Sequence, residues 1–543
     1  MSDVLYARER MLISGDQAVA LAALHAGVAL AAGYPGTPST EILEALSALG
    51  GPAQWAPNEK VALEVCMGAA YGGARSLCTM KHVGVNVAAD PLFTVAYTGV
   101  SGALVLISAD DPGMASSQNE QDNRRYAVAA GLPMLEASDS QEAYDLTLAA
   151  FELSGRWQVP VILRMTTRVC HSKTVVIPGG PLSAPPTPAF VRDIAGRVMI
   201  PAHARPAHRR LRAKLAEIAA FGETSELNQV VGESGTLGII TSGISYPHVR
   251  EAAPEAKVLK LGLIYPLPEQ LLRDFVASVE RCVVIEEGDP YLADALRAMG
   301  LAVEAKSEMY RFGELNVARV RRILAHDDSP EPVPARGKPP QLCDGCPYRR
   351  VFETLTRLDC IVSGDIGCYT LGALPPLSAM DSQSCMGASL GVGLGLRHVL
   401  PEADAKRVVS IIGDSTFVHS GITGLVEMAY NRPATGHVLI ILDNGTTAMT
   451  GQQEHPGTGR LLDHEPTHKL DFEALCRAVG IDDVVTLDVA TDPEGFEQRL
   501  VAALADGGLH VLIAKRPCLL AAKRIREYER LAEQSAVEVC GNE

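Results

Sequence analysis

Short apolar runs alternate with longer amphipathic stretches through the first third of the chain. The runs lie at residues 28–32, 77–80, 103–108 and 159–163. Runs of this length between stretches with helical periodicity are typical of buried parallel strands. Residues 11–170 therefore predict a doubly wound α/β fold, in which helices cover both faces of a mostly parallel sheet.

Two further sets of apolar runs predict two more α/β units. The runs of the smaller, second unit lie at residues 237–241, 258–261 and 282–286. The runs of the last unit lie at residues 407–412, 438–442 and 511–514. Because helix-like segments separate the runs in both sets, we expect parallel sheets here as well.

Proline-rich and basic segments separate the three units. A proline-rich stretch at 178–188 is followed by a basic helix around residues 209–214, whose charges we interpret as a solvated face. A second proline-rich stretch, 328–340, precedes the last unit. We therefore expect domains at 1–175, 236–330 and 342–528, a linker and helix at 176–235, a linker at 331–341 and a tail at 529–543.

The last unit carries polar residues where two of its apolar runs stop. The first run stops at Gly413-Asp414, and the next one stops at Asp443-Asn444. Two parallel strands joined by a helix end at the same edge of the sheet, and ligands of such sheets bind there. Asp414 and Asn444 then offer two hard oxygen ligands that suit Mg²⁺, with phosphates supplying the rest. The alternative is that both residues only cap turns after buried strands.

Four of the twelve cysteines follow a pattern that burial in apolar segments does not explain. Cys343 and Cys346 form a CxxC, Cys368 follows in Gly-Ile-Gly-Cys, and Cys518 lies beyond the last apolar run. Four thiolates from loops at one sheet edge suit a 4Fe–4S cluster or a tetrahedral zinc ion. A CxxC alone is also found in redox pairs. Zinc sites more often show a second close-spaced pair, so the pattern favours iron–sulfur.

Three polar residues of the first unit follow its predicted strands. Thr37 lies in a turn, where we expect it to be the N-cap of a helix with Pro38 at N1; a helix N-terminus also attracts anions. Glu59 precedes the predicted helix 61–71, where an acid usually complements the helix dipole. His82 lies in a polar loop after a strand, and it is either functional or a structural histidine.

Composition narrows the class of protein. The chain has 543 residues, 47% of them hydrophobic and 21% charged, as in ordinary globular proteins. A net charge of −16 argues against a nucleic-acid or anionic-membrane partner. The first residues contain no apolar signal region, and no run approaches the roughly 18 residues of a membrane span. We therefore expect a cytoplasmic protein whose cysteines are not in disulfides.

The spacing between Asp414 and Asn444 resembles the diphosphate motif of thiamine diphosphate enzymes, and the continuation from Asn444 to Gln453 resembles the 2-oxoacid:ferredoxin oxidoreductases. With the cysteine pattern and the loops 80–86 and 110–122, the sequence is most similar to the large (α) subunits of indolepyruvate ferredoxin oxidoreductases. The resemblance covers nearly all of residues 10–525. It implies two doubly wound thiamine diphosphate-binding domains, of the pyrimidine and diphosphate types, separated by a transketolase C-terminal-like α/β domain.

The resemblance also assigns roles to individual residues. It implies that Mg²⁺ binds Asp414, Asn444 and the main-chain carbonyl of Thr446. It implies that Glu59 hydrogen-bonds the aminopyrimidine of the cofactor, that Thr37 contacts the substrate carboxylate, and that His82 contacts substrate or cofactor. Further contacts with the cofactor are expected at Gly413, Ser415, Asp365 and Gly367. One 4Fe–4S cluster is expected on Cys343, Cys346, Cys368 and Cys518.

The implied activity is oxidative decarboxylation of a 2-oxoacid, such as indolepyruvate or another aryl pyruvate, to acyl-coenzyme A and CO₂. The electrons would leave through the cluster. The implied partners are a small β subunit, an electron acceptor protein, and a second copy of the chain in a homodimer or α₂β₂ assembly. Asp344 and Tyr348 depart from the family's Cys-Pro-Gly-Cys-Pro-His.

Two other functions stay open at this point. One is a non-oxidative thiamine diphosphate-dependent 2-oxoacid decarboxylase, and the other is a catalytically silent assembly subunit. The chain ends about 25 residues after Cys518, without the two-cluster ferredoxin-like run usual in the family, which favours the decarboxylase. The four cysteines oppose it. The presence of Glu59, Asp414 and Asn444 opposes the silent subunit.

Overall fold

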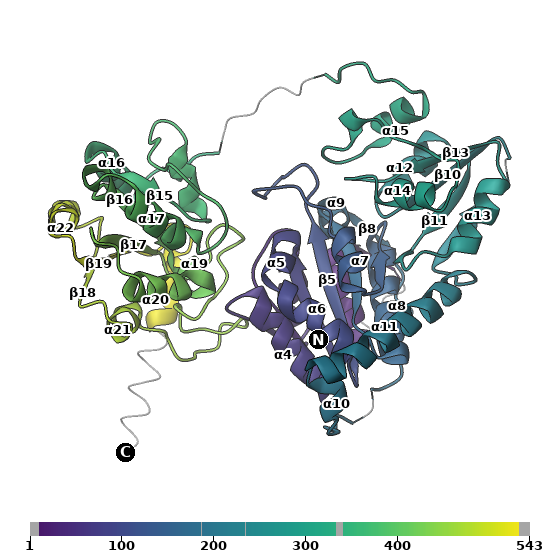
Figure 1. Ribbon diagram of the computed structural model, residues 1–543, viewed down its shortest axis with the longest axis horizontal. Coiled ribbons are helices and arrows are strands. Elements are labelled where there is room, and N and C mark those ends of the chain that lie inside the picture. Colours follow the sequence, from purple (N-terminus) through teal and green to yellow (C-terminus); the bar gives the residue numbers. More distant parts are fainter. Residues whose placement is uncertain (1–9, 186, 234, 333–339, 531–543) are drawn as a thin grey trace. The chain divides into compact units, whose positions relative to one another are not determined.

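The computed structural model describes residues 10–185, 187–233, 235–332 and 340–530 (Figure 1). The chain divides into two compact units, residues 1–332 and residues 333–543, and each is described by itself. The boundary falls within the predicted linker 331–341. No helix among the described residues is long and apolar enough to cross a membrane.

The first unit is built on a seven-stranded sheet with the order β12-β6-β7-β5-β4-β2-β3. All its neighbours pair in parallel except β12, which runs antiparallel to β6. The strands are β2 (Leu30–Gly33), β3 (Ala53–Trp55), β4 (Arg75–Lys81), β5 (Ala103–Asp110), β6 (Met134–Glu136), β7 (Val161–Thr166) and β12 (Leu263–Tyr265). A short antiparallel pair, β1 (Met11–Ser14) and β8 (Lys173–Val176), stands apart from this sheet. The four strands predicted from apolar runs are thus confirmed as β2, β4, β5 and β7.

Helices follow these strands in the order that the alternating pattern predicts. They are α2 (Gly15–His25), α3 (Thr40–Ala48), α4 (Glu59–Tyr71), α5 (His82–Val87), α6 (Ala89–Thr98), α7 (Arg124–Ala130), α8 (Ser140–Trp157) and α9 (Thr167–His171). The central strand β5 is buried along its whole length, because helices cover both faces of the sheet.

A second sheet within the first unit has the order β14-β13-β10-β11-β9. Its strands are β9 (Asn228–Val231), β10 (Leu237–Ser242), β11 (Lys257–Leu261), β13 (Arg281–Ile285) and β14 (Glu304–Ala305). Its helices are α12 (Ser245–Ala252), α13 (Glu269–Ala277), α14 (Tyr291–Ala298) and α15 (Val317–Leu324), with a 3₁₀ turn η1 (Glu308–Tyr310). Helices α10 (Ile194–Arg197) and α11 (Pro201–Gly222) precede this sheet, and α11 contains the predicted basic helix.

Buried ion pairs join the parts of the first unit. Arg124 lies 2.7 Å from Glu286 and 2.6 Å from Asp122, and all three side chains are at most 5% exposed. Arg164 lies 2.7 Å from Asp110 and also pairs with Glu136. Because each buried charge has a partner of opposite sign, these networks avoid the cost of an isolated buried charge.

The second unit contains a five-stranded parallel sheet with the order β15-β16-β17-β19-β18. The strands are β15 (Ile361–Ser363), β16 (Val408–Gly413), β17 (His437–Asp443), β18 (Asp483–Leu487) and β19 (Leu509–Lys515). The helices are α16 (Tyr348–Arg357), α17 (Ala388–Val399), α18 (Glu402–Ala405), α19 (Asp414–Thr416), α20 (Ile422–Tyr430), α21 (Phe472–Ala478) and α22 (Pro493–Asp506), with η2 (Cys368–Ala373) and η3 (Phe417–Gly421). The predicted fold class is therefore confirmed in both units.

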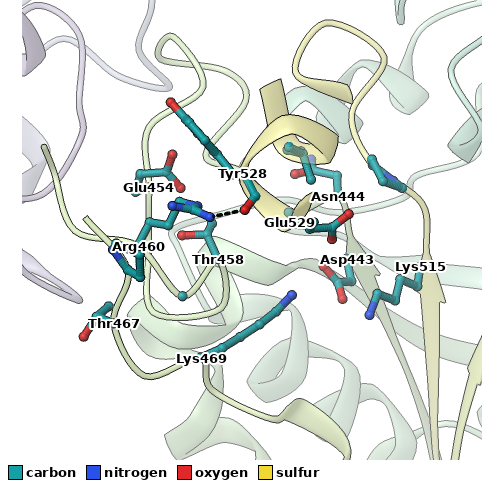
Figure 2. A pocket seen from close by; sticks show the side chains of 15 residues that line it. Asp443, Asn444, Glu454, Thr458, Arg460, Thr467, Lys469, Lys515, Tyr528 and Glu529 are labelled. Atoms are coloured by element: carbon teal, nitrogen blue, oxygen red, sulfur yellow. Dashed lines mark hydrogen bonds between the residues drawn. The ribbon is translucent and has the colours of Figure 1, made fainter. Parts of the chain in front are cut away.

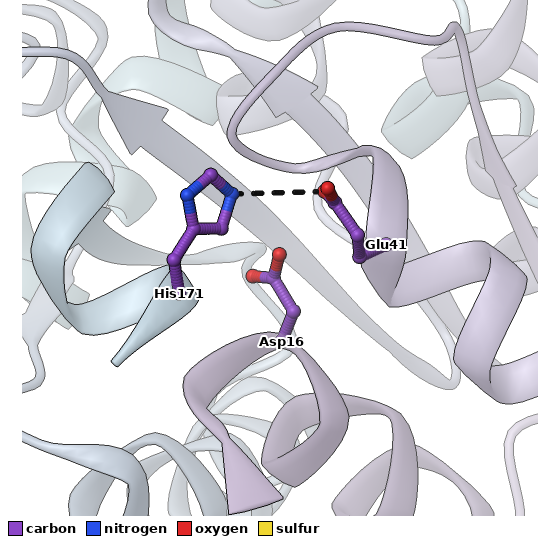
Figure 3. A group of neighbouring side chains, drawn as sticks. All are labelled: Asp16, Glu41 and His171. Atoms are coloured by element: carbon purple, nitrogen blue, oxygen red, sulfur yellow. Dashed lines mark ion pairs between the residues drawn. The ribbon is translucent and has the colours of Figure 1, made fainter. Parts of the chain in front are cut away.

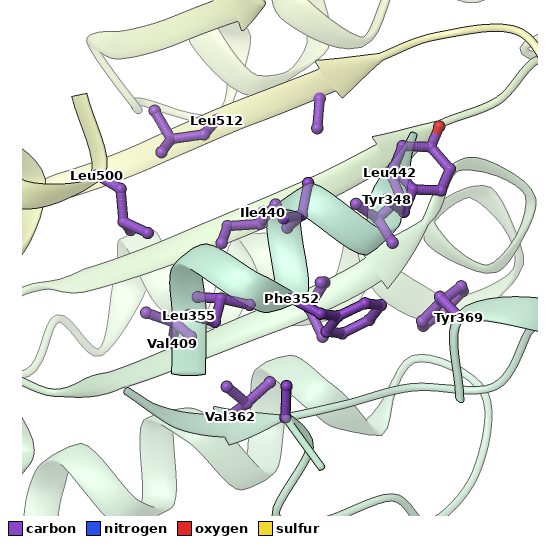
Figure 4. Packing of buried hydrophobic residues seen from close by; sticks show 14 of the residues in the cluster. Tyr348, Phe352, Leu355, Val362, Tyr369, Val409, Ile440, Leu442, Leu500 and Leu512 are labelled. Carbon is purple, nitrogen blue, oxygen red and sulfur yellow. The ribbon is translucent and has the colours of Figure 1, made fainter. Parts of the chain in front are cut away.

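Two apolar clusters cover the two faces of this sheet. On one face, Phe352 and Leu355 of α16 pack toward the strands together with Leu500 of α22 (Figure 4). Cys346 and Cys368 lie against the same cluster. The helix that follows the CxxC is thus anchored in the core, and this anchoring holds the cysteines near one edge of the sheet.

Candidate functional site

Asp414 joins the ends of two neighbouring strands in the second unit. It follows β16, and its side chain is 2% exposed. Its Oδ2 accepts hydrogen bonds from the main-chain N–H of Asn444 (3.1 Å) and of Gly445 (2.8 Å), both beyond the end of β17. Its Oδ1 accepts one from the N–H of Ser415 at 2.8 Å. The predicted meeting of Asp414 and Asn444 at one sheet edge is therefore confirmed.

The loop after Asn444 folds back on this carboxylate. The side-chain oxygen of Asn444 accepts the N–H of Thr446 at 2.9 Å, and the Ser415 hydroxyl lies 2.8 Å from that of Thr447. The Thr446 hydroxyl donates to the carbonyl of Gln453 at 3.1 Å, and Thr446 is 3% exposed. A carboxylate, a side-chain amide oxygen and main-chain carbonyls are thus gathered in a tight turn. This donor set fits Mg²⁺, which prefers hard oxygen ligands.

His455 adds a contact that the sequence did not reveal. Its Nε2 lies 3.3 Å from Oδ2 of Asp414, and the ring is 4% exposed. Its Nδ1 accepts the N–H of Gly457 at 3.2 Å, so Nε2 is the ring nitrogen that carries a proton on the side of the carboxylate. The spacing of motifs along the sequence did not indicate His455, because the loop that brings it back to this edge of the sheet has no periodic pattern.

Asp443, the residue before Asn444, shows how strongly negative this edge is. Burial and the neighbouring carboxylate of Asp414 raise the pKa of Asp443 to about 6. Lys515, His455 and Lys469 act in the opposite direction. A bound cation would relieve the same repulsion between carboxylates, which is a second observation that fits a metal at this edge.

A cavity of about 250 Å³ opens beside the main chain of Asp443 to Gly445 (Figure 2). Three cationic side chains line it together with acidic ones, and Lys469 points toward Asp443. Arg460 donates to the carbonyl of Tyr528 at 2.6 Å, which ties the helical segment 522–530 to the wall of the cavity. The lysines can neutralise part of the acidic edge, while the cavity gives access to it from outside.

The predicted cluster cysteines come together at the same edge. Cys343 and Cys346 precede α16, Cys368 opens η2, and Cys518 follows β19. Burial, together with the neighbouring thiols of Cys518, Cys343 and Cys346, raises the pKa of Cys368 to about 11. The main-chain N–H of Cys518 donates to the carbonyl of Asn444 at 2.9 Å. The thiols therefore lie close enough to interact, directly beside the loop of the predicted Mg²⁺ ligands.

The spacing of the sulfurs bears on the choice between zinc and iron–sulfur. Within residues 10–185, 187–233, 235–332 and 340–530, a single group of three or more metal-ligating side chains has all its donor atoms within 4.8 Å of one another, and it lies in the first unit. No three of the four predicted cluster thiols therefore lie within 4.8 Å of one another. A tetrahedral zinc ion with Zn–S bonds of about 2.3 Å needs sulfurs about 3.8 Å apart. The wider spacing favours a larger inorganic group.

Asp365, Gly367 and Gly413 shape the loops around this edge. Asp365 is fully buried and accepts the N–H groups of Ile366 (2.9 Å), Gly387 (2.8 Å) and Ser389 (2.9 Å), the last two at the start of α17. These bonds hold the loop after β15 against the start of α17, and the predicted contact of Asp365 with the cofactor stays a prediction. A Cβ at Gly413 or Gly367 would lie 2.8 or 2.4 Å from the ring of Tyr369, so this ring needs both glycines.

Glu59 lies at the carboxyl edge of the sheet in the first unit. It begins α4, whose N-cap Asn58 accepts the N–H of Val61 at 2.9 Å, and Glu59 is 5% exposed. A Cβ on Gly84 of α5 would lie 2.6 Å from Oε1 of Glu59. The missing side chain of Gly84 therefore makes the space in which the Glu59 carboxylate rests.

His82 begins α5 and is fully buried. Its Nε2 lies 3.2 Å from both the carbonyl and the side-chain oxygen of Asn119. Burial lowers the pKa of His82, so the ring is neutral near pH 7. The carbonyl of His82 accepts the side-chain amides of Gln121 (3.0 Å) and Asn123 (3.1 Å), which fixes the loop 110–122 over it.

Thr37 is not the helix N-cap that the sequence predicted. Helix α3 begins at Thr40, and Ser39 occupies the N-cap position. The reason is a tight turn in which the N–H of Gly36 donates to the Thr40 hydroxyl and the N–H of Ser39 donates to the Gly36 carbonyl, both at 2.9 Å. These bonds hold Thr37 in the turn itself, where it is partly exposed.

The turn of Thr37, Glu59 and His82 share one edge, because they follow the parallel strands β2, β3 and β4. Lys81, at the end of β4, also belongs to this group. It is 9% exposed, burial lowers its pKa, and the nearby charges of Asp111 and Glu59 raise it. A Cβ on Gly36 would lie 3.2 Å from that of Lys81, so the Thr37 turn packs against this lysine.

Two protein-family models match the chain. The model "Pyruvate flavodoxin/ferredoxin oxidoreductase, thiamine diP-bdg" matches residues 21–179. The model "Thiamine pyrophosphate enzyme, C-terminal TPP binding domain" matches residues 365–514. The first match contains Glu59, and the second runs from Asp365 to Ala514 in β19. The two predicted cofactor-binding edges therefore fall within thiamine diphosphate-binding families.

Curated relatives match nearly the whole chain. The indolepyruvate oxidoreductase subunit IorA of Archaeoglobus fulgidus is 40% identical over 98% of this chain and 90% of its own length. That of Methanothermobacter thermautotrophicus is 39% identical over 99% and 92%, and that of Pyrococcus abyssi is 36% identical over 97% and 88%. A solved 2-oxoglutarate:ferredoxin oxidoreductase from Magnetococcus marinus has a TM-score of 0.52 at 19% identity, over 59% of this chain and 65% of that chain, and shares the fold.

Proposed function

Because the chain belongs to the family of indolepyruvate oxidoreductase subunit IorA, we propose that it is the thiamine diphosphate-binding subunit of an oxidoreductase that acts on indolepyruvate or a related aryl pyruvate. The reaction would be oxidative decarboxylation, with coenzyme A as the acyl acceptor. The observation that carries the proposal is the carboxylate of Asp414, buried and bonded to the loop of Asn444 within a thiamine diphosphate-binding domain.

Asp414, Asn444 and the carbonyl of Thr446 would hold Mg²⁺, which in turn holds the diphosphate of the cofactor. Bound thiamine diphosphate supplies the nucleophilic carbon and the electron sink that decarboxylation of a 2-oxoacid needs. The chain contributes a carboxylate that its own N–H groups already orient, so little ordering remains when the ion binds. His455 would keep Asp414 oriented from the other side.

In the first unit, Glu59 would exchange a proton with the aminopyrimidine N1′ of the cofactor. Its burial supports this role, because a proton held away from water passes to the bound group and not to solvent. We assign contacts with the substrate carboxylate to Thr37, which lies in an ordered turn beside the cationic Lys81. His82 is neutral and held in place by Asn119, so it would act as a hydrogen-bonding group.

Cys343, Cys346, Cys368 and Cys518 would hold one 4Fe–4S cluster that takes the electrons. Their mutual interaction and wide spacing support this assignment, as does the bond from Cys518 to Asn444, which places the cluster loop beside the cofactor loop. The same four thiols argue against the non-oxidative decarboxylase, which has no use for them. Since the relatives are named as subunits, we also assign this chain a small partner subunit and an electron acceptor protein.

Calorimetry with thiamine diphosphate and Mg²⁺ tests the cofactor site. Asp414→Ala should weaken cofactor binding by more than the roughly 100-fold that loss of an outer-shell partner can cost, because the ion loses its charged ligand. Asp482→Ala is a matched control, since Asp482 is exposed and precedes β18 at the opposite edge of the sheet. Equal cofactor affinity of the Asp414 variant and the wild type would refute the site.

Metal analysis of anaerobically purified protein tests the cluster. The wild type should contain about four irons per chain in this site. Cys518→Ser should lower this number, whereas Cys385→Ser should not, because Cys385 is exposed and outside the group. Stoichiometric zinc in place of iron would overturn the assignment, and an absence of metal would favour the decarboxylase. Ferredoxin reduction with and without the co-expressed small subunit then tests the proposed electron path.

A further inference from the structure

Three metal-ligating side chains other than Glu59 and His82 meet in the first unit. Asp16 lies in the first turn of α2, Glu41 lies in the first turn of α3, and His171 ends α9. One donor atom from each lies within 4.8 Å of the others. Figure 3 shows the carboxylate of Asp16 directed toward the space between Glu41 and the imidazole of His171.

A glycine makes this meeting possible. A Cβ on Gly15 would lie 2.2 Å from the carbonyl oxygen of Val169 and 2.9 Å from the side chain of Met165. Only glycine therefore lets the start of α2 approach α9 so closely. A capping box between Ser14 and Gln17 fixes the first turn of α2, so Asp16 is held in position beside the end of α9.

Asp16 is buried without a strong hydrogen-bond donor. Its side chain is fully buried, and neither of its oxygens has a hydrogen-bond partner among the residues that the structure describes. The Cys170 thiol, a weak donor at best, is the polar group beside it. Burying a carboxylate without donors costs several kcal/mol, so the group is either protonated or bound to a cation.

The other two side chains leave room for a cation. His171 Nε2 lies 3.8 Å from Oε2 of Glu41, and no hydrogen-bond donor among the described residues reaches this oxygen, which is shielded from solvent. Ligands on a metal ion with bonds of about 2.1 Å are about 3.0–3.5 Å apart, so a small inward shift completes the geometry. The whole side chains of Glu41 and His171 are 46% and 40% exposed, which leaves one side of the cluster open to water.

We propose that Asp16, Glu41 and His171 bind a divalent first-row transition-metal ion, with water completing its coordination. One imidazole and two carboxylates suit Mn²⁺, Fe²⁺ or Zn²⁺ better than Ca²⁺ or Mg²⁺, which prefer oxygen ligands alone. The site is separate from the Mg²⁺ and the cluster of the proposed function. It has a structural role, because Glu41 lies in the first turn of α3, directly after the turn that carries Thr37.

The competing state is a protonated Asp16 with no metal. Burial and the charge of Glu41 raise the pKa of Asp16, so the metal-free site holds a proton that a metal ion must displace. The two states differ in one measurable property, since only the metal site coordinates nitrogen from His171. The test therefore needs a probe that reports the ligand atoms and not only the amount of metal.

Mn²⁺ is the suitable probe, because it avoids thiolates and is paramagnetic. The full chain is freed of thiamine diphosphate and carries Asp414→Ala, which removes the predicted Mg²⁺ ligand. This protein should bind one Mn²⁺ per chain, with an imidazole nitrogen coupling in its pulsed electron paramagnetic resonance spectrum. His171→Gln should remove the coupling, and Asp16→Asn should weaken binding by at least the roughly 10–100-fold expected for an outer-shell partner.

Glu44→Gln is the matched control, because Glu44 lies on α3 outside the cluster and is exposed. This variant should bind Mn²⁺ like the parent protein. Should Asp16→Asn fail to fold, His171→Gln and Glu41→Gln still decide, since both side chains are partly exposed and leave the buried packing in place. A lack of Mn²⁺ binding would overturn the proposal in favour of the protonated acid. Binding that keeps its nitrogen coupling in His171→Gln would overturn it by placing the ion elsewhere.

Discussion

Gly84→Ala tests whether the resting place of the Glu59 carboxylate matters for its proposed function. The added Cβ would lie 2.6 Å from Oε1, 2.7 Å from Cγ and 2.9 Å from Cδ of Glu59. Real Cβ atoms essentially never approach other heavy atoms so closely, so either the carboxylate or the start of α5 must move. Because α5 is tied to the loop 110–122 through the carbonyl of His82, we expect the carboxylate to move.

The magnitudes separate the effect on activity from the effect on folding. Alanine is favoured over glycine within a helix by about 0.8–1 kcal/mol, while overpacking a buried site costs about 1–3 kcal/mol. The net loss of stability is therefore about 0–2 kcal/mol. A displaced general acid–base group costs about 10²–10⁴-fold in rate. At about 1.36 kcal/mol per factor of ten, this equals roughly 2.7–5.4 kcal/mol of barrier.

The assay is exchange of the C2 proton of added thiamine diphosphate, followed by proton NMR, together with a thermal melt of each variant. Gly84→Ala should melt close to the wild type yet exchange the proton far more slowly. Gly68→Ala is the matched control, because Gly68 lies in α4 with no atom within 4 Å of its added Cβ. Wild-type exchange in a folded Gly84→Ala protein would show that Glu59 does not act from this position.

Two further predictions concern the second unit. His455→Gln should weaken binding of Mg²⁺ and thiamine diphosphate by roughly 10–100-fold without abolishing it, because the ring lies 3.3 Å from the Asp414 carboxylate and would orient it. A calorimetric affinity equal to that of the wild type would contradict this prediction. Burial lowers the pKa of His437 to about 3 from its usual 6.5. The neutral, buried ring therefore makes its full contribution to the free energy of unfolding above pH 6.5. As the pH falls from 6.5 toward 3, this contribution is lost at about 1.4 kcal/mol per pH unit. His437→Gln should therefore melt with a weaker pH dependence than the wild type between about pH 7 and 5, and parallel curves would refute the assignment.

The strands and their order along the chain could be predicted, because a strand that is buried on both faces is a continuous apolar run in the sequence. The apolar run at 438–442 became the centre of β17, and the run at 103–108 became most of the fully buried β5. Both strands are covered by helices on each side, so nearly every position must be apolar. The predicted meeting of Asp414 and Asn444 followed from the handedness of a strand–helix–strand unit, which depends on chain chirality and not on distant contacts.

The errors and omissions come from contacts between distant segments. Thr37 satisfied the local rule for an N-cap, but the turn bonds between Gly36 and Thr40 displaced the start of the helix. Asp365 is predicted as a cofactor contact, and the sequence did not reveal that its oxygens accept three N–H groups, two of them at the start of α17. His455 reaches Asp414 through an irregular loop, so its contact with Asp414 could not be predicted from motif spacing. Local patterns therefore identify elements better than they identify partners.

The arrangement at the edge of the second sheet relates the two predicted metal groups to each other. Cys368, Asp414, Asn444 and Cys518 follow β15, β16, β17 and β19, which are consecutive in the sheet. With strands about 4.8 Å apart, the two outer cysteines leave the sheet roughly 14 Å from each other, too far to share a cluster directly. A cluster shared by these cysteines would therefore require the loops to converge above the inner strands.

Contacts between the loops of the predicted cofactor site and those of the predicted cluster would hold such a convergence. The ring of Tyr369, next to Cys368, lies over Gly413 at the end of β16, and a side chain there would come within 2.8 Å of it. The N–H of Cys518 bonds to the carbonyl of Asn444 at 2.9 Å. Each cysteine loop is thus fastened to the loop of a predicted Mg²⁺ ligand. Since a shift in either loop must move the other, the chain itself would keep the proposed cofactor site and the proposed cluster at a fixed separation.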